Sequence, residues 1–248
     1  FFSNIGMWAL IYGRLWLMRT LTDSEAMLGL VASATLTPVL LFSILGGVIA
    51  DKYNRLRILR FTRLMFCFLT FFTGLLIFLE IINPTILILI SFVTGTLLAF
   101  DIPSRSSMIA KLVEKKYLPV GISMYSIVFG VSGIIGPSLF HPIVNLMGLE
   151  GLFLIIGISY LLTFMTLKKM SYKLHDPIKS TSTGFKNELR LGWNYLLGTP
   201  IIFVVVFIGF FFGLTAGSYD VLLPAITTDL LNGDSEVYGK LLLYGGVA

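Results

Sequence analysis

The sequence predicts an all-α integral membrane protein, and three observations lead to this class. Of the 248 residues, 56% are hydrophobic and only 12% are charged, whereas a soluble domain carries about twice that charged fraction. Uncharged runs such as residues 26–50 and 64–79 approach the ~20 apolar residues that a helix needs to cross a bilayer. The charged residues gather in the connections between such runs. Together these observations exclude a soluble protein.

The uncharged lengths predict seven complete or nearly complete membrane segments and the start of an eighth. They cover about residues 1–21, 26–50, 60–79, 82–101, 119–146, 150–167, 200–223 and 237 onward. This order predicts a six-helix N-terminal bundle in residues 1–168, a cytoplasmic linker in 169–199, and the start of a second bundle in 200–248. Phe1 lies in an apolar helical pattern without an initiator Met, and Ala248 stops inside another, so we expect a fragment.

The Lys and Arg residues mark one side of the membrane. Three connections hold 15 of the 18 basic residues: Lys52, Arg55, Arg57, Arg60 and Arg63; Arg105, Lys111, Lys115 and Lys116; Lys168, Lys169, Lys173, Lys179, Lys186 and Arg190. The loops between them are acidic and hold Asp23, Glu25, Glu80, Glu150, Asp229, Asp234 and Glu236. Cytoplasmic loops retain Lys and Arg, so we expect the basic side to face the cytoplasm. The net charge of +5 therefore reflects orientation in the bilayer and not nucleic-acid binding.

The longest polar connection predicts a linker followed by a surface helix. Residues 175–177 (His-Asp-Pro) and 180–184 (Ser-Thr-Ser-Thr-Gly) are typical of a flexible linker. Apolar residues then recur at helical spacing over 185–196, with charges between them. This pattern predicts an amphipathic helix on the inner membrane surface. An ordinary solvated linker is equally compatible with it.

The hinge between the second and third segments carries the most specific pattern. It reads Gly46-Gly47-Val48-Ile49-Ala50-Asp51-Lys52-Tyr53-Asn54-Arg55-Leu56-Arg57. Paired glycines allow two backbones to approach closely, and Asp51 and Arg55 share one face of a continuing helix because they are four residues apart. Basic residues that only anchor the topology would explain the charges, but neither the glycine pair nor the lone aspartate.

This hinge resembles the signature between helices two and three of the major facilitator superfamily of secondary transporters. The resemblance implies a fold of two six-helix bundles that rock about a central site, of which this chain is a part. It assigns a conformational switch to Gly46, Gly47, Asp51, Lys52, Arg55 and Arg57. In such a switch Asp51 accepts hydrogen bonds from the opposing bundle, with Arg55 orienting it, and holds the inner side shut while the cavity faces out.

The fifth segment contains a small-residue motif ending in proline. Gly130, Gly133 and Gly136 form a groove for a neighbouring helix, and Pro137 kinks the segment. The motif resembles the glycine-proline motif of antiporter members, and plain helix packing is the alternative. His141 and Phe140 follow where relatives usually keep glycines.

A candidate inner gate lies at the end of the fourth segment. Asp101 and Arg105 are one turn apart around Pro103, so they predict either a latch that breaks when the gate opens or an exposed ion pair of about 0–1 kcal/mol. With Pro119 and the Gly136-Pro137 pair, this segment resembles the exporter branch that includes enterobactin efflux proteins. Where such relatives often carry an acid and a base in helix one, this chain has Met7 and Ile11, which leaves no obvious proton-coupling carboxylate there.

Two charges lie inside predicted membrane segments. Arg14 in mid-bilayer costs about 2.5–3.5 kcal/mol on insertion scales, so it predicts an anion contact or a gate charge, with snorkelling to the outer surface as the alternative. Asp220, beside Tyr219, is the second candidate. We hypothesise that Arg14 and Asp220 pair across the outer gate. The complete set of cavity candidates is Asn4, Trp8, Tyr12, Arg14, Tyr125, Tyr219 and Asp220. Their aromatic rings suit a bulky amphipathic solute, or ordinary helix packing.

Three functions compete at this point. The first is ion-coupled efflux, with protons as the expected ion, of a hydrophobic or siderophore-like small molecule, and the second is nutrient uptake by the same fold. The third, a membrane-embedded enzyme or sensor, lacks an HExxH motif, a nucleophile elbow or a phosphate-binding loop. We expect no catalytic residue, no cofactor and no metal, and the single Cys67 excludes an intrachain disulfide. The expected partners are the lipid bilayer, protons and a small-molecule substrate, for a monomer in the bacterial plasma membrane.

Overall fold

The computed structural model describes residues 1–170, 190, 194–195 and 197–247. Within these residues every regular element is helical, which confirms the all-α membrane class. The elements are α1 (Phe2–Leu21), α2 (Glu25–Lys52), α3 (Arg55–Phe78), α4 (Pro84–Leu112), η1 (Lys115–Tyr117), α5 (Leu118–Ser138), α6 (Phe140–Lys169), α8 (Pro200–Ala225), η2 (Ile226–Leu230) and α9 (Ser235–Val247). The predicted flexible linker lies outside the described residues, as does most of the predicted amphipathic helix.

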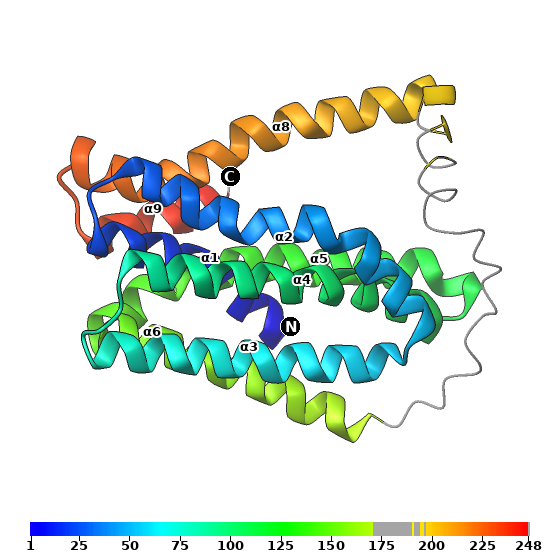
Figure 1. Ribbon diagram of the computed structural model, residues 1–248, viewed down its shortest axis with the longest axis horizontal. Helices are drawn as coiled ribbons and strands as arrows, with labels where there is room; N and C mark the ends of the chain where they lie inside the picture. The colour runs from blue at the N-terminus through cyan, green and yellow to red at the C-terminus, as the bar shows by residue number, and fades with distance from the viewer. Residues whose placement is uncertain (171–189, 191–193, 196, 248) are drawn as a thin grey trace.

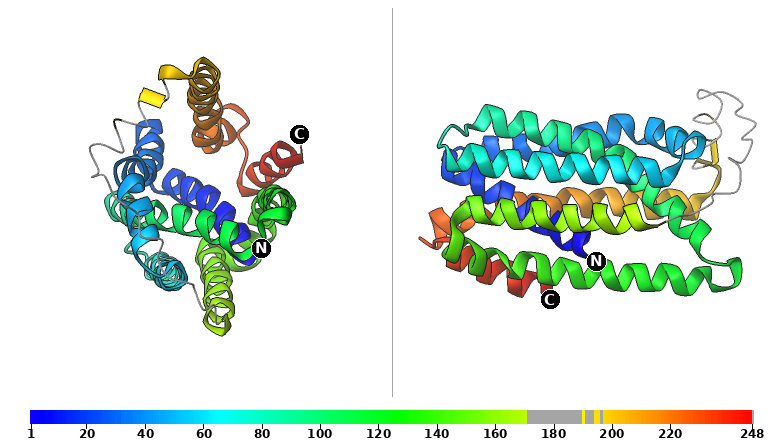
Figure 2. Two further views of the ribbon diagram at one scale, coloured as in Figure 1. Left: turned by 90° about the vertical axis from the view of Figure 1, so that its right-hand side faces the viewer. Right: turned by 90° about the horizontal axis from the view of Figure 1, so that it is seen from below.

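Six helical stretches in the described part of the chain are long and apolar enough to cross a membrane. They belong to α2, α3, α4, α5 and α6, and to α8 together with η2. Viewed along the helices, α1 lies inside the ring formed by the others (Figure 2). Its inner position explains how it accommodates Arg14 and Arg19, because most of its surface faces protein and not lipid.

Two predicted boundaries need correction. The sequence predicts that the fourth segment ends near residue 101, but α4 stays helical through Pro103 to Leu112, because Asp101 and Arg105 find partners on neighbouring helices and no longer need the aqueous phase. The fifth segment is predicted to run to residue 146, but α5 ends at Ser138, just after Pro137. Helical geometry is then interrupted within α6 at Gly148, whose φ of 71° places it in the left-handed region.

The connections divide between the two ends of the molecule. The α2–α3 and α4–α5 connections and the last residues of α6 lie together at one end (Figure 1), which we call the basic end. The α1–α2, α3–α4 and α8–α9 connections lie at the other, the acidic end. The described parts of the basic connections, which are predicted to share one side, therefore share one end of the structure.

Helices α2 and α4 form a close backbone contact. A Cβ atom on Gly46 of α2 would overlap the main-chain carbonyl oxygen of Ala99 in α4. The relation is reciprocal, because a Cβ atom on Gly95 of α4 would overlap the carbonyl oxygen of Thr35 in α2. Gly47, in contrast, has no neighbour within 4 Å of such an atom. One member of the glycine pair thus makes the predicted close approach.

Helix α8 meets the bundle near the acidic end and diverges from it toward the basic end (Figure 1). Ile201, Val205 and Phe212 are 77%, 64% and 71% exposed along its length. Leu223 and Ala225, near its last turn, are buried. The first bundle and α8 are therefore joined at the acidic end and apart at the basic end.

The glycine contact leads to a matched pair of variants. We expect Gly46→Leu to destabilise the protein by about 1–3 kcal/mol, the usual cost of forcing a larger side chain into a packed interface. Gly47→Leu, one residue along the same helix, should be tolerated because its Cβ has open space. The apparent thermal midpoint of the purified protein in detergent measures both. Equal midpoints for the two variants would contradict the α2–α4 contact.

Candidate functional site

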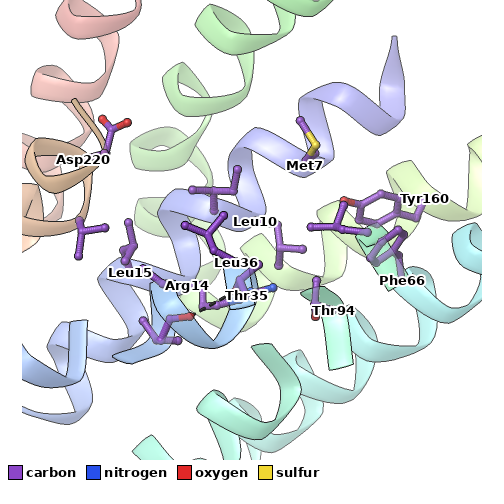
Figure 3. A pocket seen from close by; sticks show the side chains of 16 residues that line it. Met7, Leu10, Arg14, Leu15, Thr35, Leu36, Phe66, Thr94, Tyr160 and Asp220 are labelled. Atoms are coloured by element: carbon purple, nitrogen blue, oxygen red, sulfur yellow. Dashed lines mark hydrogen bonds between the residues drawn. The ribbon is translucent and has the colours of Figure 1, made fainter. Parts of the chain in front are cut away.

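A cavity of about 230 Å³ lies between α1 and its neighbours α2, α3, α4, α6 and α8. Most of its lining is apolar (Figure 3). The polar side chains in the lining are Arg14, Thr35, Thr94, Tyr160 and Asp220. Because α8 contributes Gly217, Asp220 and Val221, the cavity lies between α8 and the helices that precede it in the chain. An apolar chamber with a few polar groups suits an amphipathic small molecule.

Arg14 is almost entirely buried, with 6% of its surface exposed. Its terminal nitrogen NH1 donates a hydrogen bond to Thr35 Oγ1 at 2.8 Å. The Thr35 hydroxyl in turn donates to the Val31 carbonyl of its own helix at 3.2 Å. Arg14 therefore points from α1 toward α2 and does not snorkel to the surface (Figure 3).

The hypothesis that Arg14 pairs with Asp220 is wrong. Asp220 Oδ1 instead accepts a hydrogen bond from the Tyr12 hydroxyl at 3.5 Å. Tyr12 and Arg14 are two residues apart on α1, so they project about 200° apart around the helix. Tyr12 faces α8, whereas Arg14 faces α2. Figure 3 shows the Arg14 and Asp220 side chains directed to different parts of the cavity.

At the acidic end a different arginine, Arg19, joins α1 to the segment after α8. Arg19, 8% exposed, forms an ion pair with Asp229 of η2 and donates through Nε to Thr228 Oγ1 at 2.9 Å. It also donates to the Asp23 carbonyl at 2.6 Å. These contacts join the end of α1 to the segment that follows α8. The sequence places Arg19 beside acidic loops but does not say which acid it contacts.

Aromatic stacking reinforces this closure. The rings of Trp16 in α1 and Tyr238 in α9 stack with centroids 4.7 Å apart. Phe140 of α6 meets the Tyr238 ring edge-on at 5.1 Å. The Tyr238 hydroxyl donates to the Tyr12 carbonyl at 3.3 Å. The acidic end thus combines an ion pair between a buried arginine and an exposed aspartate with an aromatic core.

A fully buried carboxylate organises the first bundle near its basic half. Asp101 Oδ1 accepts from the Thr62 hydroxyl at 2.8 Å, and Oδ2 accepts from Arg63 at 2.7 Å. Arg105 lies 3.4 Å from Oδ2 and donates to Asn4 Oδ1 at 2.9 Å. The two groups predicted as an inner gate are therefore close together, with Asp101 fully buried and the Arg105 side chain 16% exposed, which excludes the exposed ion pair. Their partners lie on α1, α3 and α4, so a gating role stays a prediction.

A second cavity of about 290 Å³ adjoins Asp220 and is lined by Tyr12, Gly133, Pro137 and Tyr219 among others. Tyr12 and Tyr219 therefore line this second cavity and not the main one, and their role toward a solute stays a prediction. Asp220 is common to the linings of both cavities.

Three cavity candidates lie elsewhere. Asn4 binds Arg105, and Tyr125 lies 6.3 Å from the ring of Phe129. Trp8 fills the helix-five groove, where a Cβ on Gly136 would lie 2.8 Å from Trp8 Cβ and one on Gly133 would lie 3.4 Å from the indole. These side chains are outside the linings of the two cavities. Asn4 and Trp8 instead contact neighbouring helices, and Tyr125 contacts a ring of its own helix.

The helix-five motif packs against α1 along only part of its length. A Cβ atom on Gly136 would also lie 2.8 Å from the Ile5 carbonyl oxygen, whereas one on Gly130 would have no neighbour within 4 Å. Pro137 is buried. The motif therefore positions α1 beside the second cavity.

The comparisons with known proteins agree with this architecture. A family model described as "Transmembrane secretion effector" (MFS_3) matches residues 1–248. The chain belongs to the major facilitator superfamily. It is 27% identical to the staphyloferrin A transporter of Staphylococcus aureus (strain NCTC 8325 / PS 47), over 96% of this chain and 61% of that protein. It is 21% identical to the uncharacterized MFS-type transporter YkuC of Bacillus subtilis (strain 168), over 75% of this chain and 44% of that protein.

The chain thus spans less than two thirds of the length of these two superfamily relatives. Its membership makes it a transporter-type membrane protein, which argues against an enzyme.

The superfamily switch motif is only partly visible in the structure. Gly46 makes the α2–α4 contact, and the side chains of Lys52 and Arg57 are exposed. Asn54 caps α3 by accepting from the main-chain nitrogens of Leu56 and Arg57 at 3.0 and 3.3 Å. Arg55 is buried, and the side chain of Asp51 lies outside the described part. The switch role of the motif therefore stays a prediction.

Several site residues carry no sequence signal. Thr35, Thr94 and Tyr160 are ordinary members of apolar helices until the fold directs them into the cavity. The sequence assigns Arg63 to a basic connection, but this residue lies in the third turn of α3 and is 4% exposed. A charged residue that deep inside a membrane helix is the signal that could have indicated a buried partner.

The Asp101 cluster leads to a contrast between two carboxylates. Asp101→Asn leaves Arg63 and Arg105 without their buried counter-charge, so we expect a loss of about 3–5 kcal/mol. Glu236→Gln removes an exposed i,i+4 partner of Lys240, which is worth about 0.3–0.5 kcal/mol. Thermal midpoints and the folded yield in membranes measure both. A wild-type midpoint for Asp101→Asn would contradict the role of the cluster.

Proposed function

We propose that this chain is part of a proton-coupled secondary transporter that exports an amphipathic, siderophore-like small molecule by alternating access. The observation that carries the proposal is the cavity between the first bundle and α8. The bundle and α8 are in contact at the acidic end and separated at the basic end. Alternating access needs such a chamber and a breakable closure on one side of it. The Arg19–Asp229 pair supplies a closure of that kind.

The lining of the cavity and one relative support the type of solute. Leu10, Val31 and Phe66 provide apolar walls, whereas Arg14 and Thr35 provide a polar site. A relative that covers 96% of this chain is named for transport of staphyloferrin A. Both support a small molecule with an apolar body and polar groups.

The proposed direction rests on orientation. Basic connections favour the cytoplasmic side, so the described conformation would open toward the cytoplasm, where an exporter loads its solute. Gly133 and Gly136 pack on α1, and Gly133 and the buried Pro137 line the second cavity. Their resemblance to the antiporter motif favours export over uptake.

We assign the coupling proton to Asp220. Ionisable groups inside membrane proteins are costly and commonly serve ion or proton pathways. Asp220 is partly buried, contacts the Tyr12 hydroxyl, and borders both cavities. Met7 and Ile11 line the main cavity where helix one of relatives often carries charges. Asp220 is thus the acid in the described lining that can take up this role.

Transport by inside-out vesicles containing the complete protein tests this function. We expect an amphipathic substrate to accumulate when the vesicle interior is acidic, and a protonophore to abolish the accumulation. Asp220→Asn should abolish gradient-driven accumulation while retaining substrate binding, because the amide cannot carry the proton. Glu236→Gln is the matched control, since its carboxylate is exposed and outside both cavities.

Two results would contradict the proposal. Accumulation that does not depend on the gradient would exclude proton coupling, and solute movement only out of inside-out vesicles would indicate uptake in the cell.

A further inference from the structure

Arg14 differs from two other buried arginines, Arg19 and Arg63, whose charges are neutralised by aspartates. Arg19 pairs with Asp229, and Arg63 pairs with Asp101. Within the described part of the chain, Arg14 forms no ion pair, and its one hydrogen bond goes to the neutral hydroxyl of Thr35. A guanidinium has five N–H donors, so most of the donor capacity of Arg14 is unused.

We propose that Arg14 binds the carboxylate of the transported solute, which is therefore an organic anion with an apolar body. This inference rests on the proposed transport function and adds the chemical class of the substrate. An Arg guanidinium is suited to this ligand because its planar fork can form two parallel hydrogen bonds to a carboxylate.

A second group lines the cavity with unused hydrogen-bonding capacity. Tyr160 of α6 is 2% exposed, and its hydroxyl forms no hydrogen bond with any other described residue, although its ring stacks on Phe66. Arg14, Thr35 and Tyr160 come from three different helices and line one chamber (Figure 3). A carboxylate bound there would be held by charge at Arg14 and could accept a hydrogen bond from the tyrosine.

The Asp220 carboxylate also lines the cavity, but it forms no ion pair with Arg14. Asp220 accepts from Tyr12 on the face of α1 that is directed toward α8. Arg14 lies on the face directed toward α2. The positive charge of Arg14 is therefore available to a ligand.

The remaining residues of the cavity lining indicate that the body of the ligand is apolar. Met7, Leu10, Ile11, Leu36 and Phe66 surround the chamber with apolar and aromatic surface. Such walls exclude water, which strengthens the attraction between the guanidinium and an anion. The same walls disfavour a small, fully hydrated inorganic anion, because its hydration would not be replaced.

Three probes with one naphthyl body test the inference: 1-naphthylacetate, its neutral amide, and 2-(1-naphthyl)ethylammonium. Their affinities for the complete purified transporter are measured by isothermal titration. We expect the carboxylate to bind at least about tenfold more tightly than the amide, as suits a charge-assisted pair, and the ammonium to bind most weakly.

Substitutions at the cavity residues test whether Arg14 and Tyr160 cause the preference for the carboxylate. Arg14→Gln should remove the preference for the carboxylate, and Arg14→Lys should retain only part of it because the charge remains without the fork. Tyr160→Phe, which removes only a hydroxyl, should weaken carboxylate binding severalfold and leave amide binding unchanged. If Arg14→Gln fails to fold, Tyr160→Phe still tests whether the carboxylate binds at this site. Lys240→Gln is the control for lost positive charge, since Lys240 is exposed and outside the cavity.

The inference is overturned if the native protein does not prefer the carboxylate, including the case in which no probe binds, or if Arg14→Gln keeps the preference. Vesicle transport separates this result from the proposed function. Carboxylate binding at Arg14 without gradient-driven accumulation would overturn only the transport proposal. Gradient-driven accumulation of the amide and the ammonium, with no preference for the carboxylate, would overturn only the anion site.

Discussion

A charge inside the bilayer needs a partner, and this constraint governs the whole arrangement. The protein interior holds several arginines, each of which would be costly if left uncompensated. Arg63 forms an ion pair with Asp101 within the first bundle, and Arg19 of α1 forms an ion pair with Asp229 in the segment after α8. Arg14 faces a chamber with only a threonine hydroxyl as partner. We propose that Arg63 contributes to a rigid centre, that Arg19 forms a closure between the first bundle and α8, and that Arg14 provides a charge to a ligand.

These roles depend on one another. The Asp101 cluster joins α1, α3 and α4, and the glycine contacts at Gly46 and Gly95 lock α2 to α4. These contacts hold α1, α2, α3 and α4 together, so a change in their position relative to α8 must break the contacts between them and α8. The Arg19–Asp229 pair and the Trp16–Tyr238 stack form that contact at the acidic end. In the proposed transport cycle this contact breaks as the basic end closes, which exposes the cavity to the acidic side.

Much of the fold follows from local properties of the sequence. Uncharged length locates the helices, and the separation of basic from acidic connections assigns them to two ends. The glycine pair before Ala50 and the pair Asp101 and Arg105 are recognisable because their spacing on one helix is set by the helical repeat. Contacts between helices are not predictable in this way. The predicted pairing of Arg14 with Asp220 fails because a two-residue offset from Tyr12 turns Arg14 toward another helix.

The central claim is that the acidic end closes through Arg19 and Asp229 while the basic end stands open. Distances between spin labels in the complete, cysteine-free transporter test it most directly, with one pair at Thr20 and Leu231 and another at Leu112 and Ile201. All four positions are exposed. Without substrate, we predict a short, narrow distribution for the first pair and a long one for the second, and an opposite shift of both in Asp229→Arg. An unchanged first distance in that variant would contradict the account.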